Sequence, residues 1–239
     1  MIKTKEDLKQ LGTILTIWAH PDDETFTSAG LLSMATENGQ KVICVTATRG
    51  GTGKADQIQA TEEELEEIRT NELSKSLACL GDIEHEWLDY KDGHCEEVSI
   101  SESCEKVRKL IDKYQPDTVI TFGPEGLTGH SDHKAVARWA SLGVDGTDIK
   151  LYRVVHTQTQ MESYLQELDS KLNVFFNIDK PPTVNEEDAD ILLTLDAEHI
   201  SMKIDALKAQ ASQYEKMFNQ FDENFLKSAF SSEAFIQIQ

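Results

Sequence analysis

Short apolar runs alternate with helical patterns along the first two thirds of the chain. Runs rich in β-branched residues predict buried strands, and apolar residues that recur every three or four positions predict helices. The predicted strands are residues 13–17, 41–47, 86–88, 118–122 and 151–155. The predicted helices are residues 26–37, 61–80, 101–114 and 133–142. This alternation predicts an α/β fold with a mostly parallel sheet and helices on both faces.

The pattern weakens beyond Thr157. The later elements are predicted as strands at 172–178 and 191–195, an acidic loop at 180–190 and an amphipathic helix at 200–218. Residues 221–239 carry aromatic side chains, and the pattern leaves open whether these cover the core or pack on a partner subunit. No internal repeat or low-complexity tract divides the chain, so we expect a single domain over residues 1–239.

The composition limits the function classes. The chain of 239 residues has 43 acidic and 23 basic residues, which gives a net charge of −20. Such acidity argues against nucleic acid or an anionic membrane as the main partner. The four cysteines form no C-x-x-C pair, as expected of reduced cytoplasmic thiols. No stretch is typical of a signal peptide or of a membrane span, so we expect a cytoplasmic protein without membrane insertion.

One imidazole and three carboxylates follow the first predicted strand, in the segment Ala-His-Pro-Asp-Asp-Glu at residues 19–24. The carboxyl edge of the strands is where open α/β sheets place their ligand sites. His20 and Asp23 offer a nitrogen and an oxygen that suit Zn²⁺ or a related divalent ion. The alternative is that Asp22 or Asp23 caps the following helix, which is a common role for aspartate.

A second segment favours the metal interpretation. Residues 126–133, Gly-Leu-Thr-Gly-His-Ser-Asp-His, follow the fourth predicted strand and therefore lie at the same edge of the sheet. Their spacing places His130 and His133 on one face of a helix start. Alone, such a pair is more typical of ordinary hydrogen-bonded histidines than of a metal site. Asp132, between them in sequence, is a candidate to orient one of the two imidazoles.

Together the two segments supply a catalytic type of metal site, which has three protein ligands and water. The candidate ligands are His20, Asp23 and His133. Asp22 is the candidate base that accepts the proton of the water. If His133 binds the metal, His130 is free to stabilise an oxyanion or to protonate a leaving amine.

The glycine-rich residues 48–54 invite comparison with a phosphate loop. The Walker pattern needs glycine where Thr48 stands and serine or threonine where Ala55 follows Lys54, so we do not expect nucleoside triphosphate binding. No G-x-G-x-x-G segment follows the first strand, which argues against a dinucleotide-dependent oxidoreductase.

The two histidine segments resemble the signatures of a known family. Residues 19–24 are similar to the A-H-P-D-D-E signature, and residues 129–133 to the G-H-x-D-H signature, of the PIG-L/LmbE-like zinc-dependent de-N-acetylases. Weaker similarities lie at residues 48–50, 67–73 and 203–213, so that the resemblance covers about residues 13–213. It implies a Rossmann-like fold and hydrolysis of an N-acetyl group, usually from an N-acetylglucosaminyl conjugate.

The resemblance also implies roles for the site residues. It places the metal, which is Zn²⁺ with Fe²⁺ as an alternative, on His20, Asp23 and His133. It makes Asp22 the general base and His130 the residue that stabilises the tetrahedral oxyanion.

Three further roles come with the resemblance. Asp132 would support the histidine that stabilises the oxyanion. Arg69 would reach the site from its helix to hold the substrate, unless it forms a surface ion pair with Glu66 or Glu72. Arg49, in the T-x-G segment at residues 48–50, is a second candidate substrate contact.

The sequence departs from the family pattern at three positions. Gly51 stands where the family often has glutamate, and Gln210 where its late helix usually has histidine. Thr128 stands where some relatives carry a tyrosine that helps to stabilise the oxyanion. These positions bear on the outer pocket and on which substrate is accepted.

Three functions are compatible with these residues. The first is a metal-dependent hydrolase that removes the N-acetyl group of a small N-acetylated amino-sugar conjugate. The second is an amidase that cleaves a thiol-sugar conjugate or another acylated amine. The third is a metal- or sugar-binding protein without turnover, which would need neither Asp22 nor His130. A homo-oligomer is compatible with all three.

Overall fold

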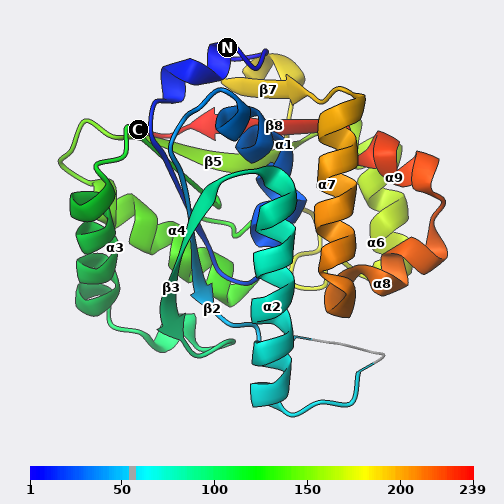
Figure 1. The fold of residues 1–239 in the computed structure, drawn as a ribbon, viewed down its shortest axis with the longest axis horizontal. Coiled ribbons are helices and arrows are strands. Elements are labelled where there is room, and N and C mark those ends of the chain that lie inside the picture. Colours follow the sequence, from blue (N-terminus) through cyan, green and yellow to red (C-terminus); the bar gives the residue numbers. More distant parts are fainter. Residues whose placement is uncertain (54–57) are drawn as a thin grey trace.

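The computed structural model describes residues 1–53 and 58–239. A twisted sheet forms its centre (Figure 1). Its strand order is β3-β2-β1-β4-β5-β8-β7, and β6 pairs with β5. The strands are β1 Ile14–Trp18, β2 Val42–Thr48, β3 Ile83–Tyr90, β4 Thr118–Thr121, β5 Lys150–Thr157, β6 Thr183–Val184, β7 Ile191–Thr194 and β8 Ser232–Gln237. Lys54 and Ala55, which bear on the phosphate-loop interpretation, lie outside the described residues.

The first five strands pair in parallel, as their alternation with helices predicts. β1 lies between β2 and β4, so the chain reverses its direction of winding beside β1. Such a reversal is where open α/β sheets leave a crevice for ligands at the carboxyl ends of the strands. β8 runs antiparallel to both β5 and β7. The predicted Rossmann-like α/β fold is therefore confirmed.

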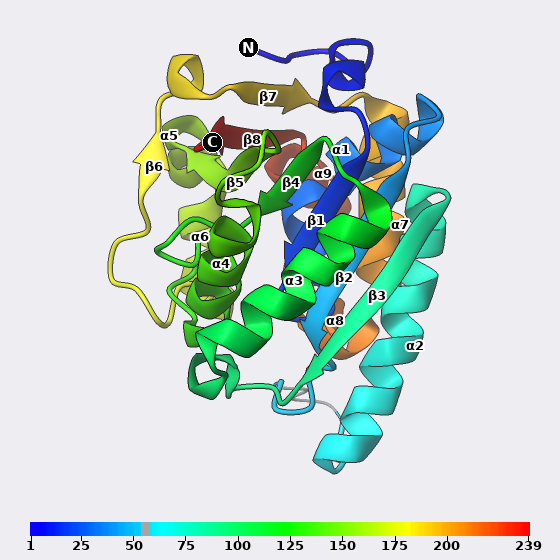
Figure 2. The same cartoon turned by 90° about the vertical axis from the view of Figure 1, so that its left-hand side faces the viewer.

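Helices cover both faces of the sheet (Figure 2). One layer contains α1 Asp23–Glu37, α2 Glu62–Leu80 and α7 Ala197–Ala209, and the other contains α3 Ile100–Tyr114 and α4 Ser131–Val144. α2 begins where its sequence predicts, because the Thr61 side chain accepts the N–H of Glu64 and the Glu64 carboxylate accepts the N–H of Thr61. Among the described residues, no helix is both long and apolar enough to cross a bilayer.

The last part of the chain packs on its own core. A second hydrophobic cluster packs against α7 and includes the buried Phe221 and Phe230. It includes residues of α6 Gln166–Leu172, α8 Ala211–Gln220 and α9 Glu223–Ala229, together with residues of α7 and of the segment 161–165. The short segments are η1 Asp7–Leu11, η2 Cys95–Glu97, α5 Gln158–Gln160, η3 Met161–Leu165 (a π-helical turn) and η4 Glu186–Asp188. The aromatic side chains of this region thus cover the core of the same chain.

Three expectations for this later part are wrong. The strand expected at 172–178 is absent, because α6 ends at Leu172 and Asn173 adopts a left-handed conformation before a turn. The acidic loop expected at 180–190 includes the short strand β6 and η4. The single helix expected at 200–218 is divided at Gln210 into α7 and α8. Strand β8 adds an element that the pattern did not predict.

A buried ion pair between α7 and β8 contacts the middle of α1. Lys203 is 1% exposed and Glu233 is 3% exposed, and Lys203 Nζ lies 2.7 Å from Glu233 Oε1. The backbone N–H groups of Gly30 and Leu31 each donate to this carboxylate at 2.8 Å. We refer to Lys203 and Glu233 as the α1 ion pair.

Candidate active site

The two histidine segments meet because they follow neighbouring strands. Residues 19–23 follow β1, residues 126–133 follow β4, and these strands pair in parallel. His20 Nδ1 lies 3.3 Å from His133 Nε2, which in turn lies 3.3 Å from Asp23 Oδ1. The distance from His20 Nδ1 to Asp23 Oδ2 is 3.6 Å. The structure therefore brings together the three predicted metal ligands.

The hydrogen bonds on the far side of each ring assign its tautomer. His133 Nδ1 lies 2.9 Å from the carbonyl oxygen of Gly126, which can only accept, so Nδ1 carries the proton. His20 Nε2 lies 3.0 Å from an Asp92 oxygen and 3.3 Å from an Asp132 oxygen, so Nε2 carries the proton. In the neutral rings, the nitrogens that face each other, His20 Nδ1 and His133 Nε2, therefore both present lone pairs.

The third ligand is held in the same way. Asp23 Oδ2 accepts the backbone N–H groups of Ala19 at 3.1 Å and His20 at 2.8 Å, which directs Oδ1 at His133. We call His20 Nδ1, His133 Nε2 and the Asp23 carboxylate the acceptor cluster. Three acceptors that face each other in a buried site repel unless a cation lies between them. The donor set therefore fits a divalent metal such as zinc.

The helix-cap alternative for the two aspartates is wrong. Asp22 occupies the N-cap position of α1, but its side chain makes no capping hydrogen bond. The Asp23 carboxylate accepts from backbone N–H groups that precede the helix and faces His133. Neither side chain is therefore used to begin α1.

Asp132 supports a different histidine from the one expected. Its carboxylate is fully buried and accepts from His20 Nε2 at 3.3 Å, from Gly93 N–H at 2.8 Å and from Cys95 N–H at 3.1 Å. Only its backbone N–H, which donates to His130 Nδ1 at 3.2 Å, contacts the histidine of its own segment. The expected support of His130 by the Asp132 carboxylate is therefore wrong, because the first turn of α4 aims that carboxylate across the site.

Asp92 is a site residue that the sequence analysis did not identify. It is 4% exposed, and its carboxylate accepts from His20 Nε2 at 3.0 Å. It also accepts from the backbone N–H and the hydroxyl of Thr52, at 2.9 and 2.8 Å. The signal that could have identified it is its position directly after β3, at the same sheet edge as the two histidine segments.

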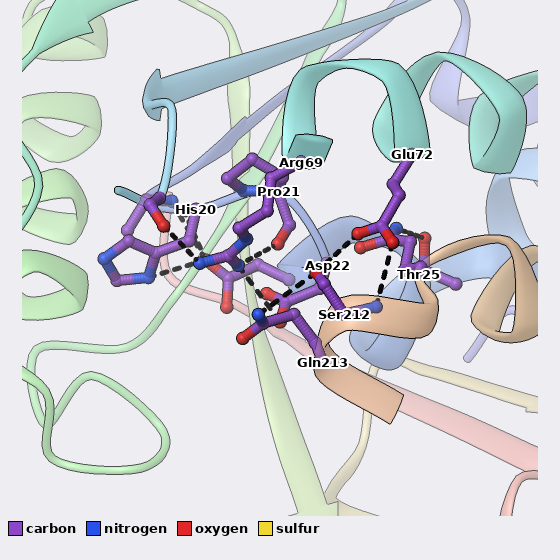
Figure 3. Close-up of polar contacts among 12 residues, drawn as sticks. His20, Pro21, Asp22, Thr25, Arg69, Glu72, Ser212 and Gln213 are labelled. Carbon is purple, nitrogen blue, oxygen red and sulfur yellow. Dashed lines mark hydrogen bonds and ion pairs between the residues drawn. The ribbon is translucent and has the colours of Figure 1, made fainter. Parts of the chain in front are cut away.

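Asp22 lies next to the acceptor cluster without being part of it. Its backbone has φ of 116°, a region that non-glycine residues rarely adopt. Its carboxylate lies 3.3 Å from Arg69 Nη2 (Figure 3). Burial raises the pKa of Asp22 to about 8, although the Arg69 charge opposes that shift. A carboxylate with a raised pKa beside a metal site is suited to accept a proton from water.

Arg69 is buried in the site, so its interpretation as a surface ion pair with Glu66 or Glu72 is wrong. Its side chain is 4% exposed and reaches from α2 to Asp22 and to the carbonyl oxygen of Pro21 (Figure 3). It also donates to the carbonyl oxygen of Gly50 at 3.0 Å.

The glycines of the loop make room for this arginine. A Cβ atom at Gly50 or at Gly53 would overlap the Arg69 guanidinium. Gly51 packs against Glu66 of α2, since a Cβ atom there would lie 2.9 Å from Glu66 Cγ. The side chain of Glu66 thus lies beside the position where the family often has glutamate.

Arg49 contacts other residues. Its guanidinium donates to an Asp89 oxygen at 2.7 Å and lies 4.4 Å from the centre of the Trp87 ring. It also donates to the Thr70 hydroxyl at 3.3 Å. None of these partners belongs to the acceptor cluster, so the placement gives no support to a substrate contact by Arg49.

His130 presents a proton donor to the site. Its Nδ1 accepts a backbone N–H, so Nε2 carries the hydrogen. Its ring lies 4.8 Å from the His20 ring and 5.2 Å from the His133 ring, measured between centroids. Burial lowers the pKa of His130 to about 4. A neutral imidazole that donates from Nε2 is suited to stabilise a developing oxyanion.

Comparison with known proteins agrees with this geometry. The profile of the PIG-L family, described as GlcNAc-PI de-N-acetylase, matches residues 15–142, which is more than half of the chain. A 1D-myo-inositol 2-acetamido-2-deoxy-alpha-D-glucopyranoside deacetylase from Saccharomonospora viridis is 28% identical over 228 residues and is aligned over 84% of each chain. A probable N-acetyl-alpha-D-glucosaminyl L-malate deacetylase 2 from Bacillus cereus is 28% identical over 127 residues, which are 52% of this chain and 57% of the relative.

A solved structure shares the fold. The N,N'-diacetylchitobiose deacetylase from Pyrococcus horikoshii superposes with a TM-score of 0.68 at 22% identity, over 97% of this chain and 85% of the other. Both signature segments that supply the acceptor cluster, at residues 19–24 and 129–133, lie within the residues that the family profile matches. The chain therefore belongs to the PIG-L family.

Proposed function

We propose that this member of the PIG-L family is a metal-dependent deacetylase that hydrolyses the N-acetyl group of a small N-acetylglucosaminyl conjugate. One observation carries the proposal: three acceptors converge in a buried site, beside a carboxylate that is not needed to bind the metal. A protein that only binds a metal has no use for that fourth group. The relatives, whose names describe N-acetylglucosaminyl deacetylases, support the reaction class.

The acceptor cluster would hold the metal through His20, Asp23 and His133. Two imidazoles and one carboxylate are ligands typical of Zn²⁺, and Fe²⁺ suits the same set. When bound, the ion acidifies water and polarises the amide carbonyl. Asp92 and Asp132, which fix the His20 ring, would keep its Nδ1 aimed at the ion.

The remaining residues move protons and stabilise charge. Asp22 would accept a proton from water as the water oxygen attacks the acetyl carbon. His130 would donate a hydrogen bond from Nε2 to the oxyanion that forms. The proton held by Asp22 would then pass to the amine nitrogen as the carbon–nitrogen bond breaks. Acetate and a free amino sugar are the products.

The names of the relatives indicate the class of conjugate. The relatives' names describe inositol and malate conjugates of N-acetylglucosamine, so we propose a substrate of this small, polar class. Arg69 lies in the site and stays a predicted substrate contact, although its guanidinium already holds Asp22. Location in the cytoplasm and assembly as a homo-oligomer also stay predictions.

Acetate release tests the function. The purified protein, loaded with Zn²⁺ or with Fe²⁺, is given N-acetylglucosaminyl conjugates of inositol and malate, N,N'-diacetylchitobiose and N-acylated amines without a sugar. We expect acetate and a free amine from at least one sugar conjugate and none from the other amines. Release only from amines without a sugar would favour the amidase alternative. Full metal occupancy without turnover would favour a binding protein.

A further inference from the structure

The backbone of Asp22 needs support from other residues. A φ of 116° is costly for a residue with a Cβ atom and persists only where the surroundings impose it. Arg69 holds the carboxylate of this residue at 3.3 Å and donates to the carbonyl oxygen of Pro21, which leaves the N–H of the same peptide to another partner. The contacts of the Asp22 backbone N–H are therefore important for where the carboxylate points.

Glu24 accepts that N–H group. Its Oε2 lies 3.1 Å from the Asp22 nitrogen, and its side chain is fully buried. A buried carboxylate is stable only when other donors occupy its remaining lone pairs. At Oε1 these donors are the Thr25 hydroxyl at 2.6 Å and the side-chain amide of Gln210 at 2.8 Å.

Gln210 comes from the opposite end of the sequence. It is 1% exposed and lies at the junction of α7 and α8, where the helix expected from the pattern is divided (Figure 1). Its Nε2 donates to Glu24 and also lies 2.9 Å from the Thr25 hydroxyl and 3.0 Å from the Ser76 hydroxyl. The amide therefore fixes the Glu24 carboxylate from the side away from Asp22.

The junction itself is attached to α2. Glu72 accepts the Ser212 backbone N–H at 2.8 Å and the Ser212 hydroxyl at 2.5 Å (Figure 3). Glu72 and Arg69 are three residues apart on α2, so the same helix holds both the Asp22 carboxylate and the start of α8. The place of Gln210 is thus fixed relative to the arginine that faces Asp22.

We propose that Gln210 is a positioning residue, which acts through Glu24 on the backbone of Asp22 and so aims the catalytic carboxylate. This inference rests on the proposed function only in assigning Asp22 as the base. It gives a role to one of the departures from the family pattern, because Gln210 stands where that pattern has histidine. Both side chains can offer one N–H to Glu24, whereas an aliphatic side chain cannot.

Three variants separate positioning from general stability. Gln210→Leu removes the donor to Glu24, and Gln210→His replaces it with a ring N–H. Ser76→Ala is the matched control, because it removes a hydroxyl from the same buried group without touching Glu24. For Gln210→Leu we expect kcat to fall about 10- to 100-fold with KM and metal content unchanged, as expected of a displaced catalytic group. Gln210→His should regain most of kcat, and Ser76→Ala should lower Tm but keep kcat within about twofold.

A crystal structure of each variant gives a readout that does not need turnover. In Gln210→Leu we expect the Glu24–Asp22 hydrogen bond to lengthen and the Asp22 φ to leave its present value, while Ser76→Ala keeps both. An undisturbed Asp22 in Gln210→Leu, unchanged kcat, or an equal fall of kcat in Ser76→Ala would overturn the inference. If the wild-type protein releases no acetate, the proposed function fails, and the crystal structures still decide whether Gln210 positions Asp22.

Discussion

Helix α1 contacts two buried groups of charges that differ in how they are completed. At its N-terminus lies the acceptor cluster, in which three lone pairs face one another within 3.6 Å. At its middle lies the α1 ion pair, in which the Glu233 carboxylate accepts from Lys203 and from two backbone N–H groups. Among the described residues, no lysine or arginine pairs with the acceptor cluster, whereas the α1 ion pair contains its own lysine.

The difference separates the group that we propose to bind the metal from one that stabilises the fold. A buried charge pair with all its hydrogen bonds made offers nothing to a ligand, but losing one partner is costly. A buried set of acceptors without a donor is stable only when a cation arrives. The same helix thus contacts a structural pair and the proposed metal site, and the two are expected to respond differently to metal removal and to mutation.

Metal removal should have the largest effect on the acceptor cluster. We expect chelation to reduce acetate release by at least about 10³-fold, because the ion supplies several kcal/mol of charge stabilisation. Tm should fall as well, since binding of an ion stabilises the folded state. Acetate assays before and after chelation, with Zn²⁺ added back, provide the measurement. A metal-free sample that keeps its full rate would contradict the assignment.

The next largest effect is expected at the proposed base. Asp22→Asn removes the proton acceptor and keeps the shape of the side chain, so kcat should fall about 10³-fold. Metal content should remain as in the wild type, because Asp22 is not a ligand. Single-turnover acetate release and metal analysis of the same sample measure both quantities. A variant with normal kcat would show that another group takes the proton.

The α1 ion pair should affect stability instead of catalysis. Glu233→Ala leaves Lys203 and two N–H groups without their acceptor, and we expect the free energy of unfolding to fall by about 3 kcal/mol or more. The double variant Lys203→Met with Glu233→Met should recover much of this loss, because no charge remains buried. Urea unfolding of the metal-loaded proteins tests both. A loss below about 1 kcal/mol for the single variant would show that the pair is not needed.

A smaller effect is expected from the carboxylates behind His20. Asp132→Asn should weaken metal affinity about 10- to 100-fold, as losses of outer hydrogen bonds to a ligand histidine usually do. The control is Asp89→Asn, because Asp89 is an exposed carboxylate that contacts Arg49. This variant should leave the metal affinity unchanged. Competition with a chromogenic chelator gives the affinities. Equal affinity in both variants would mean that Asp132 does not orient the ligand.

The smallest effect is expected at Arg49. Its contacts to Asp89 and Trp87 lie on an exposed part of the surface, where an ion pair contributes little. Arg49→Ala should therefore change kcat/KM by less than about threefold. Initial rates over a range of substrate concentrations decide this. A tenfold rise in KM would restore the role that the sequence resemblance suggested for it.

The central part of the site could be predicted from the sequence because parallel strands share one carboxyl edge. That rule brought His20 and His133 together across more than a hundred residues without any structural information. It does not fix which way a side chain turns in the first turn of a helix. Asp132 was therefore assigned to its neighbour in sequence, although its carboxylate contacts His20.

The less predictable parts depend on contacts between distant segments. Gln210 divides a helix whose sequence has no proline or glycine near the break, and its buried partners lie on α1 and α2. Asp92 was not identified from the sequence because its partners, His20 and Thr52, come from two other segments. Hydrophobic periodicity contains no information on such buried polar contacts.

The glycines at residues 50 and 53 have a consequence for how such loops are recognised in other sequences. A Cβ atom at either position would overlap the Arg69 guanidinium. The glycines of this loop therefore leave room for a side chain of the same protein, which donates to the carbonyl oxygen of Gly50, and not for an external phosphate. When another sequence has a glycine-rich loop without the Walker pattern, an arginine on the helix that follows the loop is the first candidate for its partner.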